Sequence, residues 1–385
     1  MGGETILGTQ VNAESEARKF LEQGMIESYV DFVYLTNGGM PVAVAPLDSP
    51  EEKDRYRGRG KIDFNEDNIL YVTDLLRKAE DYLNTGEISK CIIEYKNISK
   101  IYEEVNDYPI ASYFYQKCLT ISKQRKDPEG EAESYMGLGL CEEGEHNIVK
   151  AQEYYETALE KALDKNLHAI DKVISEQLIR VYEKLAIDNE EEGDYHKALE
   201  YYDKCLNASK RALNTKKEAE CYLKLGMTYE KTKELEKSVE ALEMYAGICK
   251  KTGDQDGYSL ALKELAERNR QLGNMEASKK CLNELKEVQL TNKEKALESK
   301  AEASLKLGML EFQNNNLQNS VMYFEKEFFE MAKELKDQEL INIGRINTGI
   351  AKGLSKLDLY KDIIKNNYQA FLSWKFKRNP NATKK

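Results

Sequence analysis

The feature that most constrains this chain is a small residue that recurs about every forty positions, each time directly after Ile or Leu. The small residues are Ser99, Gly139, Ala186, Gly226, Ala266, Gly308 and Ala351. The residues before them are Ile98, Leu138, Leu185, Leu225, Leu265, Leu307 and Ile350. Recurrence at a steady period is typical of arrays built from one repeated supersecondary unit. The sequence therefore predicts a series of similar units rather than one globular core.

Each small residue is followed by a second small residue twelve positions later and by a bulky one four positions after that. The second small residues are Ala111, Ala151, Ala198, Ser238, Ser278 and Ser320. The bulky ones are Tyr115, Tyr155, Tyr202, Leu242, Leu282 and Phe324. Two antiparallel helices cross closely where both carry small residues, and large neighbours fill the grooves beside the crossing. The seventh unit departs from this pattern, with Ile363 and Asn367 in the two places.

This pattern resembles the tetratricopeptide repeat family, in which the first small residue is position 8 of a repeat and the second is position 20. The structural signature comprises Gly139, Ala151, Tyr155, Ala186, Ala198, Tyr202, Gly226, Ala266 and Gly308. The resemblance implies an all-α, right-handed superhelical solenoid of about seven helix-turn-helix repeats with N-terminal cap helices. The expected repeats lie near 92–125, 132–165, 179–212, 219–252, 259–292, 301–334 and 344–377.

Helix length and turn chemistry follow from the same register. Successive position-8 residues are 40, 47, 40, 40, 42 and 43 residues apart, more than the usual 34, so helices of about 17 residues are expected. Position 16 falls between the two helices of each repeat, and five of the six residues there are good N-caps. They are Asp107, Asn147, Asp194, Glu234, Asn274 and Asn316.

The rest of the chain divides by composition. Residues 1–36 are expected to form a tail and an amphipathic helix over 13–36, which ends at Asn37-Gly38-Gly39. Residues 37–65 read as a connector rich in Pro, Gly and charge, and 66–86 as a cap helix. The array then covers 87–378, and residues 379–385 form a basic tail.

Composition excludes several classes of partner. The formal net charge of -11 over 385 residues argues against nucleic acid, because phosphate contacts need a basic face. No run of 18 apolar residues is present, so no contact with a membrane is expected.

The cysteines fall inside helical patterns without a CxxC pair and are interpreted as buried thiols of a reducing compartment, the cytoplasm. They are Cys91, Cys118, Cys141, Cys205, Cys221, Cys249 and Cys281.

No catalytic, cofactor-binding or metal site is expected. The histidines, His146, His168 and His196, have no cysteine or carboxylate at ligand spacing. Gly137-x-Gly139 lacks the preceding strand and the third glycine of a dinucleotide loop, and is better explained as repeat positions 6 and 8. The sequence therefore predicts a protein that is not an enzyme.

In this family the first helix of each repeat lines the concave groove, typically with positions 2, 5, 9 and 12. The candidate groove residues are Met136, Leu140, Glu143, Ile187, Glu190, Leu223, Met227, Glu230, Leu305, Met309 and Phe312. Glu103, Glu143, Glu190 and Glu230 form a row at position 12. Our hypothesis is that the groove binds an amphipathic helix or extended segment that carries basic residues. Two alternatives stay open: the long helices bury these residues in their own core, or the 13–36 helix folds into the groove.

The N-terminal part narrows the resemblance. The run ESYVDFVYLT from Glu27 to Thr36, the connector, the cap helix and the long-period repeats together resemble a ciliary branch of the family. This resemblance implies a non-catalytic subunit of an inner dynein arm complex of the axoneme, in cilia or flagella. Such a subunit would act in arm assembly or docking, beside a dynein heavy chain and a MYND-type zinc-finger protein. The basic tail is a candidate contact for tubulin. The alternative is a soluble signalling or motor-cargo adaptor that binds amphipathic peptides.

Overall fold

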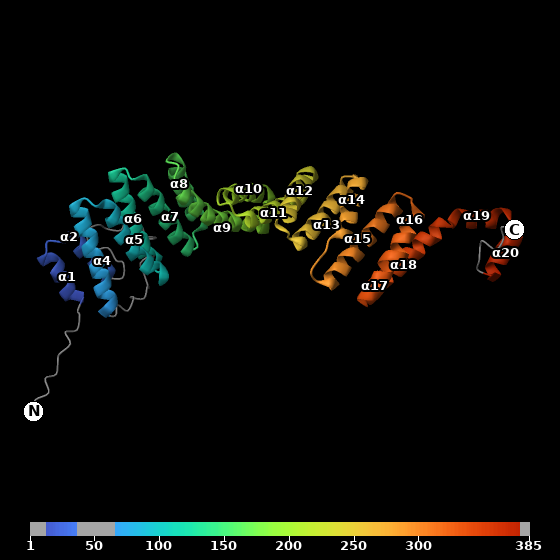
Figure 1. The fold of residues 1–385 in the computed structure, drawn as a ribbon, viewed down its shortest axis with the longest axis horizontal. Helices are drawn as coiled ribbons and strands as arrows, with labels where there is room; N and C mark the ends of the chain where they lie inside the picture. Colours follow the sequence, from blue (N-terminus) through green and yellow to red (C-terminus); the bar gives the residue numbers. More distant parts are fainter. Residues whose placement is uncertain (1–12, 37–65, 378–385) are drawn as a thin grey trace, which may run out of the picture. The chain divides into compact units, whose positions relative to one another are not determined.

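The computed structural model describes residues 13–36 and 66–377. Every regular element in these two ranges is a helix, which confirms the expected all-α solenoid class (Figure 1). The chain divides into two compact units, 1–214 and 215–385. The predicted connector 37–65 and the basic tail 379–385 lie outside the described residues, as do residues 1–12.

The first unit begins with three helices that precede the repeats: α1 (Ala13–Glu22), α2 (Ile26–Thr36) and α4 (Glu66–Thr85). Three hairpins follow: α5 (Ile88–Glu104) with α6 (Tyr108–Arg125), α7 (Pro128–Gly144) with α8 (Ile148–Asp164), and α9 (His168–Glu192) with α10 (Tyr195–Arg211).

The second unit begins with two hairpins, α11 (Thr215–Lys231) with α12 (Leu235–Thr252), and α13 (Gln255–Gln271) with α14 (Met275–Glu287). The next hairpin pairs α15 (Lys293–Gln313) with a rod made of α16 (Leu317–Val321), the π-helical turn η1 (Met322–Phe328) and α17 (Phe329–Leu335). The described part ends with α18 (Gln338–Ser355), α19 (Leu357–Asn366) and α20 (Tyr368–Lys377).

Helix lengths match the spacing of the repeats. Helices α5, α7, α8, α10, α11 and α13 have 17 residues each, and α6 and α12 have 18. Helix α9 has 25 residues, and its extra turns account for the single 47-residue step between position-8 residues.

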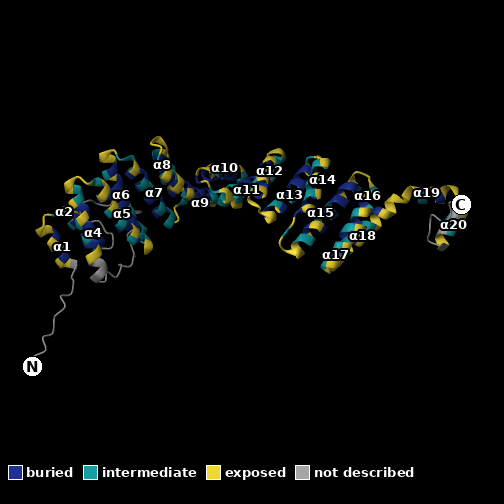
Figure 2. Ribbon diagram, viewed as in Figure 1, coloured by how far each residue is buried: buried dark blue, intermediate teal, exposed yellow. Residues whose placement is uncertain are grey.

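The two helices of a hairpin touch at the small residues of positions 8 and 20, which lie in the buried stripe of each helix (Figure 2). The ring or side chain at position 24 lies directly over position 8. A Cβ added to Gly139 would be 2.7 Å from the Tyr155 ring, and one added to Gly226 would be 2.7 Å from Cγ of Leu242. At Gly139 and Gly226 an added side chain would therefore clash with the position-24 residue unless that residue shifted.

Serine at position 20 adds a hydrogen bond to this crossing in the second unit. Its hydroxyl donates to the backbone oxygen of position 8, twelve residues earlier. The Oγ–O distances are 2.5 Å from Ser238 to Gly226, 2.7 Å from Ser278 to Ala266 and 2.9 Å from Ser320 to Gly308. Because helix carbonyls already accept the i+4 bond, this second bond forms only when the two backbones lie very close.

The turn inside each of the first six repeats has one backbone geometry. Position 15 adopts a left-handed conformation, with φ between 60° and 82°, at Asn106, His146, Gly193, Lys233, Gly273 and Asn315. The backbone N–H of position 16 then donates to the carbonyl of position 11 at 2.8–2.9 Å in all six. This six-to-one bond is the Schellman arrangement, which ends the first helix and reverses the chain.

The prediction that position 16 supplies side-chain N-caps is wrong for most repeats. Only Asp194 accepts a hydrogen bond from the backbone of its helix, from Lys197 N–H at 3.2 Å. Asn147 and Asn316 instead donate their side-chain amides to the position-11 carboxylates of Glu142 and Glu311, each at 2.9 Å. The Schellman bond already orients the backbone at this point, so the side chain is free to bind elsewhere.

The single helix expected over 13–36 is two helices. Gly24 has φ +75° and no atom near its Cβ direction, so the chain turns there even though the apolar stripe continues across the break. Phe20 of α1 and Phe32 of α2 are both buried, with ring centroids 5.7 Å apart. The stripe therefore closes a short helical hairpin.

This N-terminal hairpin packs on its own chain, against α4 and the second helix of the first repeat. Ser28 binds Glu80 and the Leu76 carbonyl of α4, at 2.8 and 3.0 Å. The buried Asp31 accepts from Lys117 at 2.5 Å and from Tyr113 at 2.9 Å on α6. Burial raises the pKa of the Asp31 carboxyl, against the pull of both donors. The alternative in which this segment occupies the groove is therefore wrong.

The seventh repeat does not close as a hairpin. Asp358 occupies position 15 but lies inside α19, and Lys356, between α18 and α19, has φ −107°. No left-handed residue reverses the chain, so α19 runs on from the end of α18 instead of folding back beside it (Figure 1). The expected second helix of this repeat is replaced by the two ten-residue helices α19 and α20.

A matched pair of glycines tests the crossing. We expect Gly226→Leu to lower the free energy of unfolding by about 1–3 kcal/mol, because the new side chain overlaps Leu242. Gly247 is exposed on α12, and a Cβ added there meets nothing within 4 Å. Gly247→Leu should therefore raise the free energy of unfolding by up to about 1 kcal/mol through helix propensity. Urea unfolding followed by circular dichroism measures both; equal effects would contradict the crossing.

Candidate functional site

The candidate groove residues of the first unit lie on the first helices α7 and α9. Met136, Leu140 and Ile187 are half-buried. They are therefore neither lost in the core nor fully open to solvent, and their remaining apolar surface is available on the first-helix side of the unit.

The second unit exposes more apolar surface on its first helices. On α11, Met227 is 44% exposed, and on α15, Met309 is 42% exposed. Leu223, Leu305 and Phe312 are half-buried beside them. The alternative in which the long helices bury all the groove residues is thus wrong for these two methionines.

The row of glutamates at position 12 is engaged by the array itself. The Tyr155 hydroxyl donates to Glu143 at 2.9 Å, and the Tyr202 hydroxyl donates to Glu190 at 3.0 Å. Burial, followed by the adjacent carboxylate, raises the pKa of both phenols, so each remains a hydrogen-bond donor. Arg180 of the next repeat adds two bonds to Glu143, at 3.0 and 3.2 Å.

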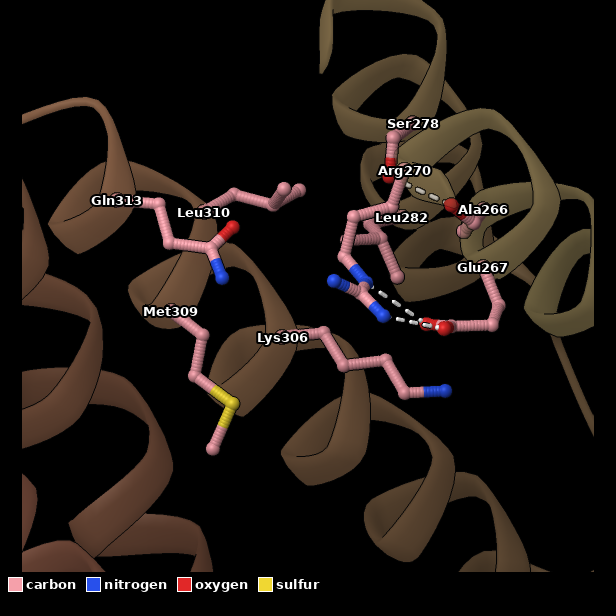
Figure 3. A pocket seen from close by; sticks show the side chains of 9 residues that line it. All are labelled: Ala266, Glu267, Arg270, Ser278, Leu282, Lys306, Met309, Leu310 and Gln313. Atoms are coloured by element: carbon pink, nitrogen blue, oxygen red, sulfur yellow. Dashed lines mark hydrogen bonds and ion pairs between the residues drawn. The ribbon is translucent and has the colours of Figure 1, made fainter. Parts of the chain in front are cut away.

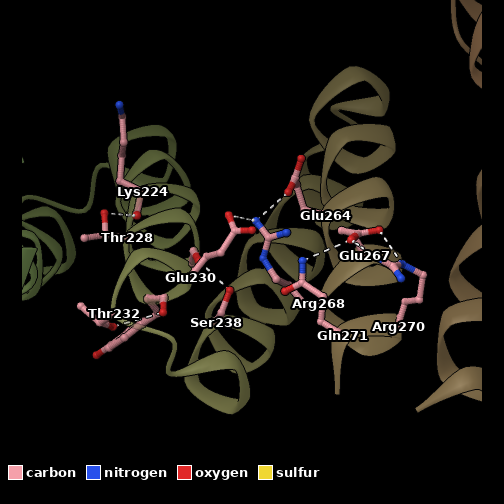
Figure 4. Close-up of polar contacts among 12 residues, drawn as sticks. Lys224, Thr228, Glu230, Thr232, Ser238, Glu264, Glu267, Arg268, Arg270 and Gln271 are labelled. Atoms are coloured by element: carbon pink, nitrogen blue, oxygen red, sulfur yellow. Dashed lines mark hydrogen bonds and ion pairs between the residues drawn. The ribbon is translucent and has the colours of Figure 1, made fainter. Parts of the chain in front are cut away.

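Glu230 has a different partner because its repeat carries Leu242 where earlier repeats carry tyrosine. The buried Arg268 of α13 donates to Glu230 of α11 at 2.6 Å and to Glu264 at 2.9 Å (Figure 4). This guanidinium joins the first helices of two successive repeats. Glu143 and Glu230 therefore join successive repeats, and Glu190 binds within its own repeat. These bonds weaken the expectation that the row selects a basic partner.

A pocket of about 320 Å³ opens between α13, α14 and α15 in the second unit. Its apolar lining comes from the side chains of Leu282, Met309 and Leu310 (Figure 3). Glu267, Arg270, Lys306 and Gln313 complete the lining with polar groups. Met309 is thus the predicted groove residue that lies in a concave site with both apolar and charged walls.

The charged groups that line this pocket have partners on their own helices. Arg270 binds Glu267 through two nitrogens, at 2.5 and 3.0 Å, and this hydrogen bonding lowers the pKa of Glu267. Lys306 pairs with Glu302 at 2.9 Å. Burial alone would raise the pKa of Glu302, but hydrogen bonds from Lys263 and Lys306 lower it. The pocket offers a fixed carboxylate and two cations around an apolar floor.

The described residues contain no group of three or more His, Cys, Asp or Glu side chains arranged to hold a metal. All seven cysteines are free; Cys281 is half-buried and the other six are buried. Burial raises the pKa of Cys91 to about 11 and of Cys118 to about 12, so these thiols stay protonated. In the part of the chain that the structure describes, no helix is long and apolar enough to cross a membrane.

Residues 177–251, from α9 to α12, match the family model for the tetratricopeptide repeat. These residues carry tetratricopeptide repeats. The six closed hairpins and their crossings at positions 8 and 20 are the structural form of this pattern.

Two curated relatives extend the similarity beyond that segment. Human tetratricopeptide repeat protein 29 is 23% identical over 325 residues, which cover 81% of this chain and 67% of the human protein. The protein of the same name from Trypanosoma brucei brucei is 21% identical, over 79% of this chain and 63% of its own. The chain thus spans about two thirds of the length of these two relatives.

Among solved structures, the C-terminal part of a TPR repeat-containing protein from Cytophaga hutchinsonii aligns with 69% of this chain and 98% of that chain. Its identity is 14% and its TM-score 0.41.

Tetratricopeptide repeats bind other proteins and are typically non-catalytic, so this chain is a protein-interaction scaffold. Two sets of residues that bind the position-12 glutamates were missed from the sequence. The Glu143–Tyr155 bond could have been found, because the first three repeats all pair Glu at position 12 with Tyr at position 24. Arg268 could not, because no other repeat places an arginine at its position 10.

The two arginines of α13 allow a test of the junction between repeats. Arg268→Ala should lower the free energy of unfolding by about 3 kcal/mol, because it leaves Glu230 and Glu264 without their buried partner. Arg270→Ala removes a partly exposed pair within one helix and should lower it by less than about 1 kcal/mol. Urea denaturation of the full chain measures both; a smaller loss for Arg268→Ala than for Arg270→Ala would show that Arg268 does not join the repeats.

Proposed function

We propose that this protein is a subunit of an axonemal inner dynein arm complex and acts in the assembly or docking of that arm. The observation that carries the proposal is the similarity to tetratricopeptide repeat protein 29 over 81% of the chain. The run ESYVDFVYLT, which forms most of α2, adds a second sequence resemblance. Its partners would be a dynein heavy chain and a MYND-type zinc-finger protein, in cilia or flagella, with the basic tail as a tubulin contact.

The fold supports a scaffolding role in such a complex. The N-terminal hairpin packs against α4 and α6 of its own unit. Met227 and Met309 on the first helices of the second unit are 44% and 42% exposed, so a partner can reach them. The alternative function, a soluble signalling or motor-cargo adaptor, is favoured by the exposed methionines Met227 and Met309, since flexible thioether side chains suit varied amphipathic peptides.

Fractionation separates these two functions. We expect the tagged full chain, expressed in a flagellated cell, to remain with detergent-demembranated axonemes and to leave with the dynein heavy chains at high salt. High salt screens contacts between charged surfaces, which is why it should release the chain together with dynein. Immunoblots of the detergent, high-salt and residual fractions measure the distribution. Recovery of the chain in the detergent-soluble fraction would favour the adaptor.

The groove itself is tested by charge placed on its exposed methionines. Met227→Glu and Met309→Glu should each reduce co-purification with the dynein heavy chain at least tenfold, since a carboxylate on an apolar contact surface must be desolvated. Met244 on the second helix α12 is 50% exposed, so Met244→Glu is the matched control and should keep wild-type capture. Helicity measured by circular dichroism should be the same in all three. Full capture by both groove variants would assign binding to another face.

A further inference from the structure

The last complete first helix, α18, carries an exposed apolar face. Ile346, Ile350 and Leu354 lie at four-residue steps and are 60%, 49% and 43% exposed. Leu357, at the start of α19, continues the line and is 40% exposed. Four large apolar side chains on one face of a helix form a continuous surface of the kind that usually meets a partner.

The same repeat position is covered elsewhere in the chain. Ile350 is position 7 of its repeat, and the six upstream residues at position 7 are at most 7% exposed. They are Ile98, Leu138, Leu185, Leu225, Leu265 and Leu307. In those repeats the second helix folds back on the first, whereas α19 runs away from α18. The open face of α18 thus presents apolar side chains that a helix covers in every other repeat.

Two glycines on this face point to a helix as the missing element. Gly349 and Gly353 lie beside Ile350 and Leu354, and a Cβ added to either would meet nothing within 4 Å. Glycine inside a helix is destabilising relative to alanine, so its presence calls for a reason. The third glycine of α18, Gly344, is explained by Phe328 and Phe329, which lie against it. Absent side chains at four-residue spacing allow the backbone of a second helix to approach closely.

Charge along the face selects the kind of helix. Arg345, Lys352 and Lys356 follow one side of the apolar line, at intervals of seven and four residues. Arg345 and Lys356 are exposed, and Lys352 pairs with Glu325. From α18 to α19 the chain has five basic and three acidic residues, although the whole chain has a net charge of -11.

We propose that the open face of α18 binds an amphipathic α-helix of another protein, one whose apolar face is flanked by acidic residues. Two other possible occupants of this face, helix α20 of the same chain and a second copy of the chain, would bring basic residues to its basic side. Helix α20 ends in the basic residues Lys375 and Lys377, and a second copy would place Arg345 and Lys356 against the same side chains. An acidic helix of about five turns would cover the 18 residues of α18. This surface is separate from the groove and does not depend on the proposed dynein role.

A pair of synthetic peptides tests the proposal with the full chain. The first is an 18-residue amphipathic helix with leucine and alanine on one face and glutamates flanking it; the second replaces every glutamate by lysine. Both carry fluorescein, and binding is measured by anisotropy. We expect the acidic peptide to bind at least tenfold more tightly than the lysine peptide. Hydrogen exchange of the complex should show new protection in α18.

Three variants make the result specific. Ile350→Glu should weaken the acidic peptide at least tenfold, and Arg345→Glu should weaken the acidic peptide and strengthen the lysine peptide. Val149 of α8 is 60% exposed, so Val149→Glu is the matched control and should bind like the wild type. Circular dichroism checks that all variants keep their helicity.

Several outcomes would overturn the proposal. They are equal affinity for the two peptides, no binding of the acidic peptide, and protection that maps to α11 or α15 instead of α18. A dimer seen by light scattering and lost in Ile350→Glu would assign the face to a second copy. Protection of α18 by α20 in the free chain would assign it to the chain itself.

Discussion

The close approach of two helix backbones at positions 8 and 20 is the contact on which the rest of the structure depends. It places the Tyr155 ring over Gly139 and brings Ser238 within bonding distance of the Gly226 carbonyl. It also lets the position-24 phenols of Tyr155 and Tyr202 donate to the position-12 carboxylates, which ties each of these glutamates to the second helix. The left-handed residue at position 15 reverses the chain, so that the second helix packs against the first at this contact. Where that residue is missing, after α18, the contact does not form and an apolar face stays open.

Much of the fold could be predicted because the same side chains recur in register. Small residues at positions 8 and 20 located the crossings, and the steps between them gave the helix lengths. The left-handed position 15 could not be read in the same way, since Asn, His, Gly and Lys all occupy it. A backbone hydrogen bond enforces that conformation, so the side chain leaves little signal. Gly24 was hidden for the opposite reason, because the apolar stripe on both sides continues through the break.

The candidate site was less predictable than the fold. Repeat register places Met227 and Met309 on the first helices, but their exposure depends on how each neighbouring repeat packs. The glutamates appeared as an acidic row because sequence alone gives their spacing without their partners. Tyr155 and Arg268 reach them from other helices, at distances of 2.9 and 2.6 Å. A row of like charges along a repeat array is therefore weak evidence for the charge of a ligand until cross-helix donors are known.

The length of α9 shows how such an array tolerates insertion. Its repeat is seven residues longer than the common step of forty, and seven residues are almost two full helical turns. An added segment of that size returns every later side chain to the face it occupied before. The extra turns precede position 1, so the crossing of Ala186 with Ala198 keeps its geometry. Chains of this architecture can thus acquire protruding helix ends in steps of whole turns, each a new surface gained without disturbing the stack beneath it.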